Sequence, residues 1–570
     1  MRFTSPSFLL LMAGCGVADL TANRRGQPLR ANETGYQVLA NNDLGMHCID
    51  KTFSVFSILP PYNVVNAQVV KSDPSGKATR LDGTTVRLTY VPVADRAGSI
   101  NSKSSAKTDF WKYAAQLFGV SLAPGQGLKG LYMPADAPAS DPPGFTWSPA
   151  LGMFRAEGIP VTPTDDKGRT NFYPLVRVSA YDVATNRLLG SVDTVLPVSD
   201  ETSCSNCHAT GKAAASDAGV RWADDADLEV QARKNIILLH DLDEGTRLAS
   251  SLPVLCARCH YSVALDLSGA GPTAEQRDRR SMSAVMHAFH SKAIQQPGLV
   301  DAPVGPGKTP PPPSQQACYQ CHPGARTQCL RGAMTDTVDC QNCHGGMAAV
   351  GGASPLLDGG SLDGAADRAP RRPWVDVPRC QSCHTGDAKS HLTALAPMDS
   401  SGLRFLTAYR TGDPSASPIR SANQRFAEEP SRQFRASKGH GGIACEGCHG
   451  STHALWSNRE PETNDSVAPT ELQGHGGFLG ECSACHGDGL ASSLDGPHGM
   501  HPVNSSKWMK KHYRYSTSQG ASCKPCHGLD LKGTALSRAF ADRTFTVEDG
   551  VKVVVKKGER IGCYGCHEGP

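Results

Sequence analysis

The chain has 570 residues, of which 39% are apolar and only 6% aromatic, and it contains 58 glycines and 40 prolines. That composition is poor in the large side chains that fill a core and rich in loop formers. Charged residues make up 19% and the formal net charge is +3, which argues against a disordered polyelectrolyte and against a nucleic-acid binder with a basic face. The unusual feature is 21 cysteines beside 20 histidines, because a disulfide scaffold needs no histidines.

The first residues have the features of an export signal. Arg2 precedes an apolar run over 8–13, which is too short to span a bilayer. Met12-Ala13-Gly14-Cys15 resembles a lipobox, in which the cysteine is lipidated and becomes the first residue of the mature chain. We expect a signal peptide over 1–14 and a lipid-anchored tether over 15–33, with an ordinary secretory signal as the alternative. No later stretch reaches eighteen apolar residues, so no transmembrane helix is expected.

Residues 34–200 are expected to form a β-rich, sandwich-like domain. Short runs rich in valine, leucine and tyrosine occupy 35–40, 64–70, 85–91 and 175–180. Turn signals such as Asp73-Pro74-Ser75-Gly76 separate them. One helix is expected over 108–118, with Asp109 in its first turn.

The cysteines beyond residue 200 follow one pattern. Eighteen of the 21 lie in nine copies of the pentapeptide Cys-x-x-Cys-His, far more than chance would give. This pentapeptide is the attachment signature of c-type haem. The eighteen cysteines that we expect to bind the cofactor are Cys204, Cys207, Cys256, Cys259, Cys318, Cys321, Cys340, Cys343, Cys380, Cys383, Cys445, Cys448, Cys482, Cys485, Cys523, Cys526, Cys563 and Cys566.

The spacing suits the chemistry of that attachment. Two thiols two residues apart can each add to one vinyl group of a haem, and the next residue then lies beneath the iron. The nine proximal ligands are therefore expected to be His208, His260, His322, His344, His384, His449, His486, His527 and His567. Zinc knuckles need two converging cysteine pairs per metal, and a thioredoxin-like pair occurs once on a βαβ unit. Neither alternative requires a histidine after every second cysteine.

Residues 201–570 are thus expected to form a nine-haem domain of short helices and loops, packed around its cofactors. Helices are plausible over 229–239 and 281–294. A polar stretch over 398–436 is a candidate divider between five-haem and four-haem segments. The first cysteines of the third and fourth motifs, Cys318 and Cys340, are 22 residues apart, so those two haems are expected to be close neighbours.

Eleven histidines lie outside the motifs, and ten of them fall in the haem region, against nine irons. That near match predicts mostly bis-histidine, six-coordinate haems, whose irons have no open position. The ten candidate distal ligands are His240, His287, His290, His391, His440, His453, His475, His498, His501 and His512. Which of the ten is surplus, and which haem each serves, is not set by the spacing.

Some of these histidines are grouped. His287 and His290 share a helix face at a spacing of three and could serve two stacked haems, or one could be a surface residue. His440 and His453 bracket the motif at Cys445, where Gly450 would let the backbone approach a porphyrin. His47 is the outlier, because it lies in the β-rich domain and would serve a haem only across an interface.

Two cysteines, Cys48 and Cys329, remain once the motifs and Cys15 are assigned. In an oxidising compartment, two leftover thiols suggest a disulfide. Such a bond would join the β-rich domain to the haem domain.

Taken together, the nine motifs over 204–567, the β-rich N-terminal part and the lipobox-like start resemble the outer-surface multihaem c-type cytochromes of metal-respiring and related bacteria. The resemblance implies an outer-membrane lipoprotein, on the periplasmic face or the cell surface, that moves electrons between the periplasm and acceptors outside the cell. Its partners would be other cytochromes, extracellular acceptors and the membrane contacted through Cys15, and self-assembly into filaments remains an alternative. No nucleic-acid partner is expected.

A second class of function is a multihaem reductase of a small nitrogen or sulfur compound. Such an enzyme needs one iron with a free distal position and charged groups beside it. Nitrite reductases often mark that haem with lysine in place of the motif histidine, and no such motif occurs here. The sequence therefore favours an electron carrier over an enzyme.

Overall fold

The computed structural model describes residues 33–138, 142–293, 313–335, 338–344, 347–350, 438–456, 458, 460–487, 496–498, 503, 506–515, 523–534, 537–547 and 550–567. The predicted signal peptide, Cys15, the fifth motif at 380–384 and the candidate divider over 398–436 lie outside these ranges. Among the described residues, none of the helices combines the length and apolar character needed to cross a bilayer.

Two antiparallel sheets dominate the N-terminal part. The larger has the order β1-β4-β8-β7, with β5 also paired to β4, and its strands are β1 (Tyr36–Asn42), β4 (Val64–Ser72), β5 (Ala78–Leu81), β7 (Thr146–Ser148) and β8 (Met153–Glu157). The smaller has the order β10-β9-β6, from β6 (Val86–Val93), β9 (Leu175–Asp182) and β10 (Leu188–Val195). The expected β-rich character of this region is confirmed.

Both sheets contribute to one apolar core. Leu39 and Val69 from the larger sheet, and Tyr90 and Val178 from the smaller, are all at most 1% exposed. Burying side chains of this size stabilises a fold by about 1.5–3 kcal/mol each. The same core extends to Trp456, Ala468, Leu472 and Leu479 from the motif-bearing part of the chain. The two parts therefore share packing and do not form separate cores.

Four short pairings connect distant segments or form local hairpins. Three are two-residue parallel pairs: β2 (His47–Cys48) with β11 (Val198–Ser199), β3 (Phe56–Ser57) with β12 (Val254–Leu255), and β13 (Arg331–Gly332) with β14 (Ala454–Leu455). The fourth is the antiparallel hairpin of β15 (Arg543–Thr546) and β16 (Lys552–Val555).

The helices are mostly short, and an aspartate immediately precedes each of the two described next. Helix α1 (Phe110–Phe118) is preceded by Asp109, whose carboxylate accepts hydrogen bonds from Thr52 and Phe53, so Asp109 lies just before the first turn and not in it as expected. Helix α3 (Leu228–Glu244) extends the helix predicted over 229–239, and Asp227 caps it by accepting from the amides of Glu229 and Val230.

The remaining helices cluster around the Cys-x-x-Cys-His motifs. The α-helices are α2 (Ser205–His208), α4 (Ala274–Arg277), α5 (Met282–Ala293), α6 (Pro313–Tyr319), α7 (Cys340–His344), α8 (Met347–Val350), α11 (Cys445–His449), α12 (Val467–Gln473), α13 (Ser483–His486), α14 (Ser506–Lys511) and α15 (Lys524–His527). The 3-10 turns are η1 (Pro134–Asp136), η2 (Leu248–Ser250), η3 (Cys256–Arg258), η4 (Val263–Leu265), η6 (His440–Gly442), η7 (Pro461–Thr463), η9 (His512–Tyr515) and η12 (Cys563–Gly565).

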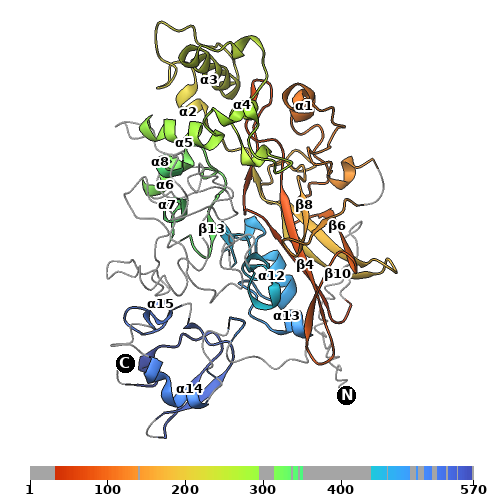
Figure 1. Ribbon diagram of the computed structural model, residues 1–570, viewed down its shortest axis with the longest axis vertical. Helices are drawn as coiled ribbons and strands as arrows, with labels where there is room; N and C mark the ends of the chain where they lie inside the picture. The colour runs from red at the N-terminus through yellow and green to blue at the C-terminus, as the bar shows by residue number, and fades with distance from the viewer. Residues whose placement is uncertain are drawn as a thin grey trace, which may run out of the picture.

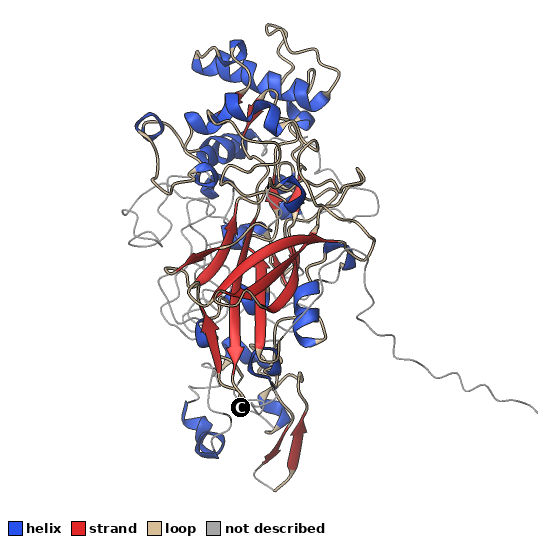
Figure 2. Cartoon of the chain, turned by 90° about the vertical axis from the view of Figure 1, so that its right-hand side faces the viewer, coloured by secondary structure: helices blue, strands red, loops and turns tan. Residues whose placement is uncertain are grey.

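The motif-bearing elements follow the long axis of the molecule. From one end to the other, Figure 1 shows α3 and α2, then α5 to α8, then β13 and α12, then α13 and α15 at about the same level, and finally α14. The sheets lie beside the middle of this series, and Figure 2 shows the helices concentrated toward one end, beyond the sheets. The sheets therefore adjoin the middle of the series, while β3 and α1 of the β-rich part reach the end that holds α3 and β12.

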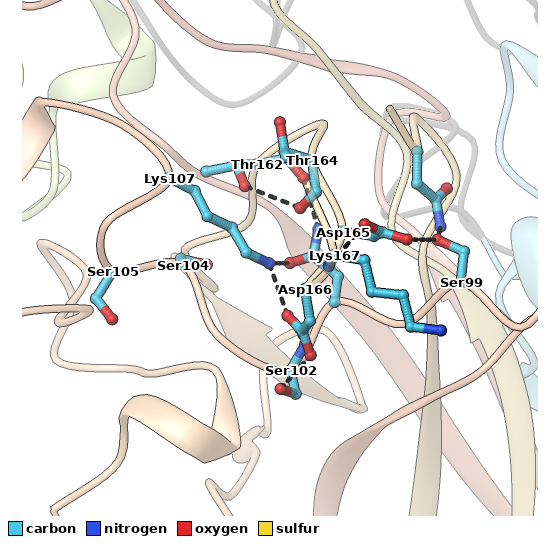
Figure 3. Close-up of polar contacts among 12 residues, drawn as sticks. Ser99, Ser102, Ser104, Ser105, Lys107, Thr162, Thr164, Asp165, Asp166 and Lys167 are labelled. Carbon is cyan, nitrogen blue, oxygen red and sulfur yellow. Dashed lines mark hydrogen bonds and ion pairs between the residues drawn. The ribbon is translucent and has the colours of Figure 1, made fainter. Parts of the chain in front are cut away.

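A polar cluster holds the long loops of the β-rich part together (Figure 3). Lys107 lies between Asn101 Oδ1, at 2.6 Å, and Asp166 Oδ1, at 2.8 Å. The neighbouring Asp165 side chain is 1% exposed and accepts hydrogen bonds from Ser99 and from the backbone and guanidinium of Arg169. Hydrogen bonds from the turn Asp165-Asp166-Lys167-Gly168 thus hold these loops in place.

Candidate functional site

Each described motif folds as a single turn of helix. In the motifs beginning at Cys204, Cys256, Cys318, Cys482, Cys523 and Cys563, the histidine amide donates to the carbonyl of the first cysteine at 2.9–3.0 Å, the i to i−4 bond of an α-turn. The motifs beginning at Cys340 and Cys445 form the short helices α7 and α11. In such a turn the two cysteines, three residues apart, lie on one side and the histidine follows directly. This is the local geometry that a group bound through both sulfurs and the imidazole requires.

A histidine from elsewhere in the chain faces seven of the proximal histidines. The ring centroids of these pairs are 5.7–6.3 Å apart: His208–His290, His260–His240, His322–His287, His344–His453, His449–His498, His486–His440 and His567–His512. Two imidazoles bound on opposite sides of one metal ion, through bonds of about 2 Å each, have centroids about 6 Å apart. The spacing in all seven pairs therefore fits one metal ion between the rings.

Hydrogen bonds at Nδ1 orient many of these imidazole rings. The Nδ1 atoms of proximal His260, His486 and His527 lie 2.7–2.9 Å from backbone carbonyls, which can only accept, so Nδ1 must carry the proton. The distal rings of His287, His290 and His512 are held in the same way, at 2.6–2.9 Å. In each neutral ring Nε2 is then the unprotonated nitrogen, and metal-binding histidines have this arrangement.

Burial keeps several of the rings neutral. Burial and the nearby His290 imidazole lower the pKa of His208 to about 4. Burial also lowers the pKa of His322, with a contribution from His453, and that of His498, with a contribution from His440. A metal ligand must be deprotonated, so these rings are in the binding form at neutral pH.

One helix and one segment each supply rings to more than one motif. His287 and His290 of α5 face the third and the first motif, as the prediction of a shared face allowed. His440 and His453 bracket the sixth motif but face the seventh and the fourth. The ring opposite the sixth motif is His498 instead. Segment 438–456 therefore contributes to three sites.

The other predicted histidines have different surroundings. Both nitrogens of His475 contact protein acceptors, Gly476 O at 2.8 Å and Glu481 at 3.4 Å, and its side chain is 56% exposed. We therefore predict that His475 is the surplus histidine. His47 is buried in β2 against Tyr62, at a centroid distance of 5.4 Å. His384, His391 and His501 lie outside the described residues.

The cysteine side chains of several different motifs lie close enough in space to interact. Cys204 interacts electrostatically with Cys321, Cys318 hydrogen-bonds Cys340, Cys448 interacts with Cys485, and Cys523 interacts with Cys563. The close approach of the third and fourth motifs, expected from their 22-residue spacing, agrees with the contact between Cys318 and Cys340.

Arg233 of α3 is a fully buried cation beside the first two motifs. It pairs with Asp50 at 3.2 Å and with Glu229 at 3.4 Å. Its charge also acts on the first cysteine of each motif, Cys204 and Cys256. Nothing in the sequence pattern singles out Arg233, since its role depends on Asp50 from the β-rich part.

Cys48 and Cys329 are half-buried thiols in the structure, and they lie near one another. Burial raises the pKa of both, that of Cys329 to about 11, and the charge of Cys329 adds to the rise at Cys48. Cys48 pairs across β2 and β11 with Ser199, whose hydroxyl is 3.5 Å from that of Thr327. The disulfide between them stays a prediction.

Comparison with known proteins adds no assignment. No family model, no curated protein and no solved structure matches this chain. Within the described ranges, no group of three or more His, Cys, Asp or Glu side chains is placed to hold a metal ion. A haem iron takes four of its ligands from the porphyrin, so two imidazoles are all that the protein must provide.

Proposed function

We propose that this chain is a multihaem c-type cytochrome that transfers electrons along a row of covalently bound haems. The observation that carries the proposal is the set of seven imidazole pairs at 5.7–6.3 Å. Each pair belongs to a Cys-x-x-Cys-His motif that would hold the haem through its two sulfurs. An iron with two axial imidazoles has no open position, so it exchanges electrons and does not bind a substrate.

Aromatic side chains beside the pairs support the fit. Phe289 is 60% exposed although its ring lies 5.7 Å from that of His290, and Phe478 is 41% exposed at 5.8 Å from His449. Large apolar groups gain free energy when they are covered. A porphyrin at each of these histidines would cover them, as expected of a domain packed around its cofactors.

The contacts between motifs give the proposed order of the haems in space. Helix α3 carries His240 opposite the second motif and Arg233 beside the first, and α5 links the first to the third. The contact of Cys318 with Cys340 links the third to the fourth. The route therefore begins second, first, third, fourth, which is not the order in the sequence.

The C-terminal half continues the row. His453 links the fourth site to the segment of the sixth, and Cys448 and Cys485 link the sixth to the seventh. Lys557 pairs with Glu481 next to the seventh motif, and Cys523 and Cys563 link the eighth to the ninth. The order parallels the series of elements along the long axis in Figure 1. The second haem would lie at one end and the eighth and ninth at the other.

We further propose that the protein is exported and lipid-anchored at Cys15 on the outer membrane. Its partners would then be other cytochromes on one side and acceptors outside the cell on the other. This part of the proposal rests on the lipobox-like start and on the resemblance described above.

The test is haem quantification followed by EPR of the oxidised, purified protein. Nine covalent haems per chain and only low-spin signals are expected. A substantial high-spin signal would favour a reductase with one open haem, and a chain without covalent haem would reject the proposal altogether.

A further inference from the structure

An exposed turn of the β-rich part touches a proximal histidine of the haem row. The turn over 73–77 joins β4 to β5, and Gly76 O lies 2.7 Å from Nδ1 of His486 in the seventh motif. The His486 ring is also the one paired with His440, at a centroid distance of 5.9 Å. This is a contact between residues about 400 positions apart, and it joins the sheet to a ligand.

The rest of the turn is built to hold that carbonyl in place. Asp73 Oδ1 accepts from the Ser75 amide at 2.8 Å, the Ser75 hydroxyl at 2.6 Å and the Lys77 amide at 3.0 Å. Gly76 has φ +81°, a conformation that glycine adopts readily, and its amide donates to Asp73 O at 2.9 Å. Asp73, Ser75 and Lys77 are exposed, whereas Gly76 is buried.

We infer that the β4–β5 turn positions His486 and lowers the reduction potential of the seventh haem, with Asp73 as the positioning residue. A hydrogen bond from Nδ1 to a carbonyl makes an axial imidazole a stronger donor, which favours ferric over ferrous iron. The inference rests on the proposed function, since it needs a haem between His486 and His440. The larger sheet would then help to set the reduction potential of the seventh haem, in addition to packing against the motif-bearing part.

The chain contains a matched control turn. Asp82, between β5 and β6, accepts from the Thr84 amide at 3.0 Å and from the Thr84 hydroxyl, and Thr85 and Val86 amides donate to its carbonyl. Its side chain hydrogen-bonds only within its own turn, and no described histidine contacts that turn. Asp82→Ala therefore removes the same kind of side-chain cap without touching a described haem ligand.

The experiment is a spectroelectrochemical titration of the full-length holoprotein and four variants, with haem content measured in each. Asp73→Ala should keep nine haems and move one of the nine redox components to a more positive potential. Ser75→Ala should give a smaller shift of the same component. Asp73→Asn, whose amide oxygen can still accept from Ser75 and Lys77, should titrate like the wild type, as should Asp82→Ala.

Two results would overturn the inference. One is an Asp73→Ala protein with nine haems and an unchanged titration, and the other is an equal shift in Asp82→Ala. If Asp73→Ala alone loses haem, Ser75→Ala decides the matter, because it removes only one hydroxyl. An unchanged titration of Ser75→Ala would then overturn the inference. A wild-type chain without covalent haem would instead reject the proposed function, so the two failures are distinct.

Discussion

A single buried side chain can hold together loops that are distant from one another in the sequence. Asp165 is a clear case, because burial alone would raise the pKa of its carboxyl, yet hydrogen bonds from Arg169, Ser99 and Lys167 lower that pKa from 3.8 to about 2. A group with a depressed folded-state pKa contributes stability above its unfolded pKa and loses it as the pH falls toward the folded value.

We therefore expect Asp165→Asn to destabilise the protein at neutral pH. An amide offers one acceptor oxygen and turns an NH2 group toward donors, which costs about 1–3 kcal/mol for a buried site. The wild-type protein should lose this stability between about pH 4 and pH 2, and the variant should lack that part of the pH dependence. Urea unfolding across this range measures both. Asp182→Asn, in an exposed turn, is the control and should change little.

Loss of the buried Arg331 side chain should be costly. Its side chain is 1% exposed, pairs with Asp465 at 2.6 and 2.8 Å, and donates to Gly45 O, while its amide donates to the carbonyl of His453. Arg331→Met leaves Asp465 buried without its cation, a change that costs about 3–5 kcal/mol.

Arg326 provides the comparison. Like Arg331, it pairs with a carboxylate, Asp200 at 2.7 Å, and lies over an aromatic ring, but its side chain is 47% exposed. Arg326→Met should cost at most about 1 kcal/mol. Chemical denaturation of both variants gives the difference directly, and equal losses would show that the burial of Arg331 has no special weight.

At the scale of elements, α5 illustrates how one helix can complete two sites. His287 and His290 are three residues apart, so their rings leave the same face toward His322 and His208. Each ring is also held through Nδ1 by the carbonyl four residues earlier, Ser283 and Met286 respectively.

Separate methionine variants should thus alter separate haems. His287→Met and His290→Met are each expected to replace one histidine axial ligand and raise the potential of one haem, because methionine ligation favours ferrous iron. The double variant should change two. Near-infrared magnetic circular dichroism counts the histidine–methionine sites. His475→Met is the control, and a new signal in that variant would contradict its assignment as surplus.

The spacing of residues along the sequence predicts the motifs, but it does not predict which distant histidine faces each motif. The nine motifs, the short helices around them and the shared face of α5 follow from the sequence, since each depends on neighbours within one or two turns. His440 and His453 show the limit: both flank the sixth motif, yet the tertiary fold turns them to the seventh and fourth. A Cβ at Gly450 would meet the Trp456 indole at 2.7 Å, so this glycine leaves room for Trp456, and its approach to a porphyrin stays a prediction.

The strands show the same division between local and distant information. Strands β1, β4, β6 and β9 were predictable because their apolar runs are long. The two-residue pairs β2–β11, β3–β12 and β13–β14 were not, because two residues carry no periodicity and their partners are distant in sequence. Of the three, β3–β12 joins the β-rich part to the segment just before the second motif, and β13–β14 joins two segments of the motif-bearing part.

For the whole molecule, the proposed row among the described motifs depends on the fourth haem. The fourth lies between the α5 sites and segment 438–456, so its removal should divide the row. We expect Cys340→Ser with Cys343→Ser to leave eight haems and to slow electron transfer strongly from the ninth to the second.

That transfer can be followed with one label and one ligand change. A photosensitiser on Lys556→Cys, an exposed site just after β16 and near the last motif, injects the electron. His240→Met gives the second haem a distinct sulfur-to-iron absorption band, which reports its arrival. The control carries the same Lys556→Cys label and His240→Met change but retains the fourth haem. The difference in arrival rate between the two proteins is then due to the fourth haem. Equal arrival rates would reject the proposed order.

Segment 438–456 also bears on how such a protein could be assembled. The ring partners of the first three motifs all lie between 240 and 290, close to those motifs in the chain. The fourth motif, by contrast, meets His453, and the seventh meets His440. During synthesis and export from the N-terminus, the first three sites can close early, while the fourth must wait with one side open until a much later stretch arrives. Maturation would then proceed in two stages, with the second committed when this one segment docks on the sheet.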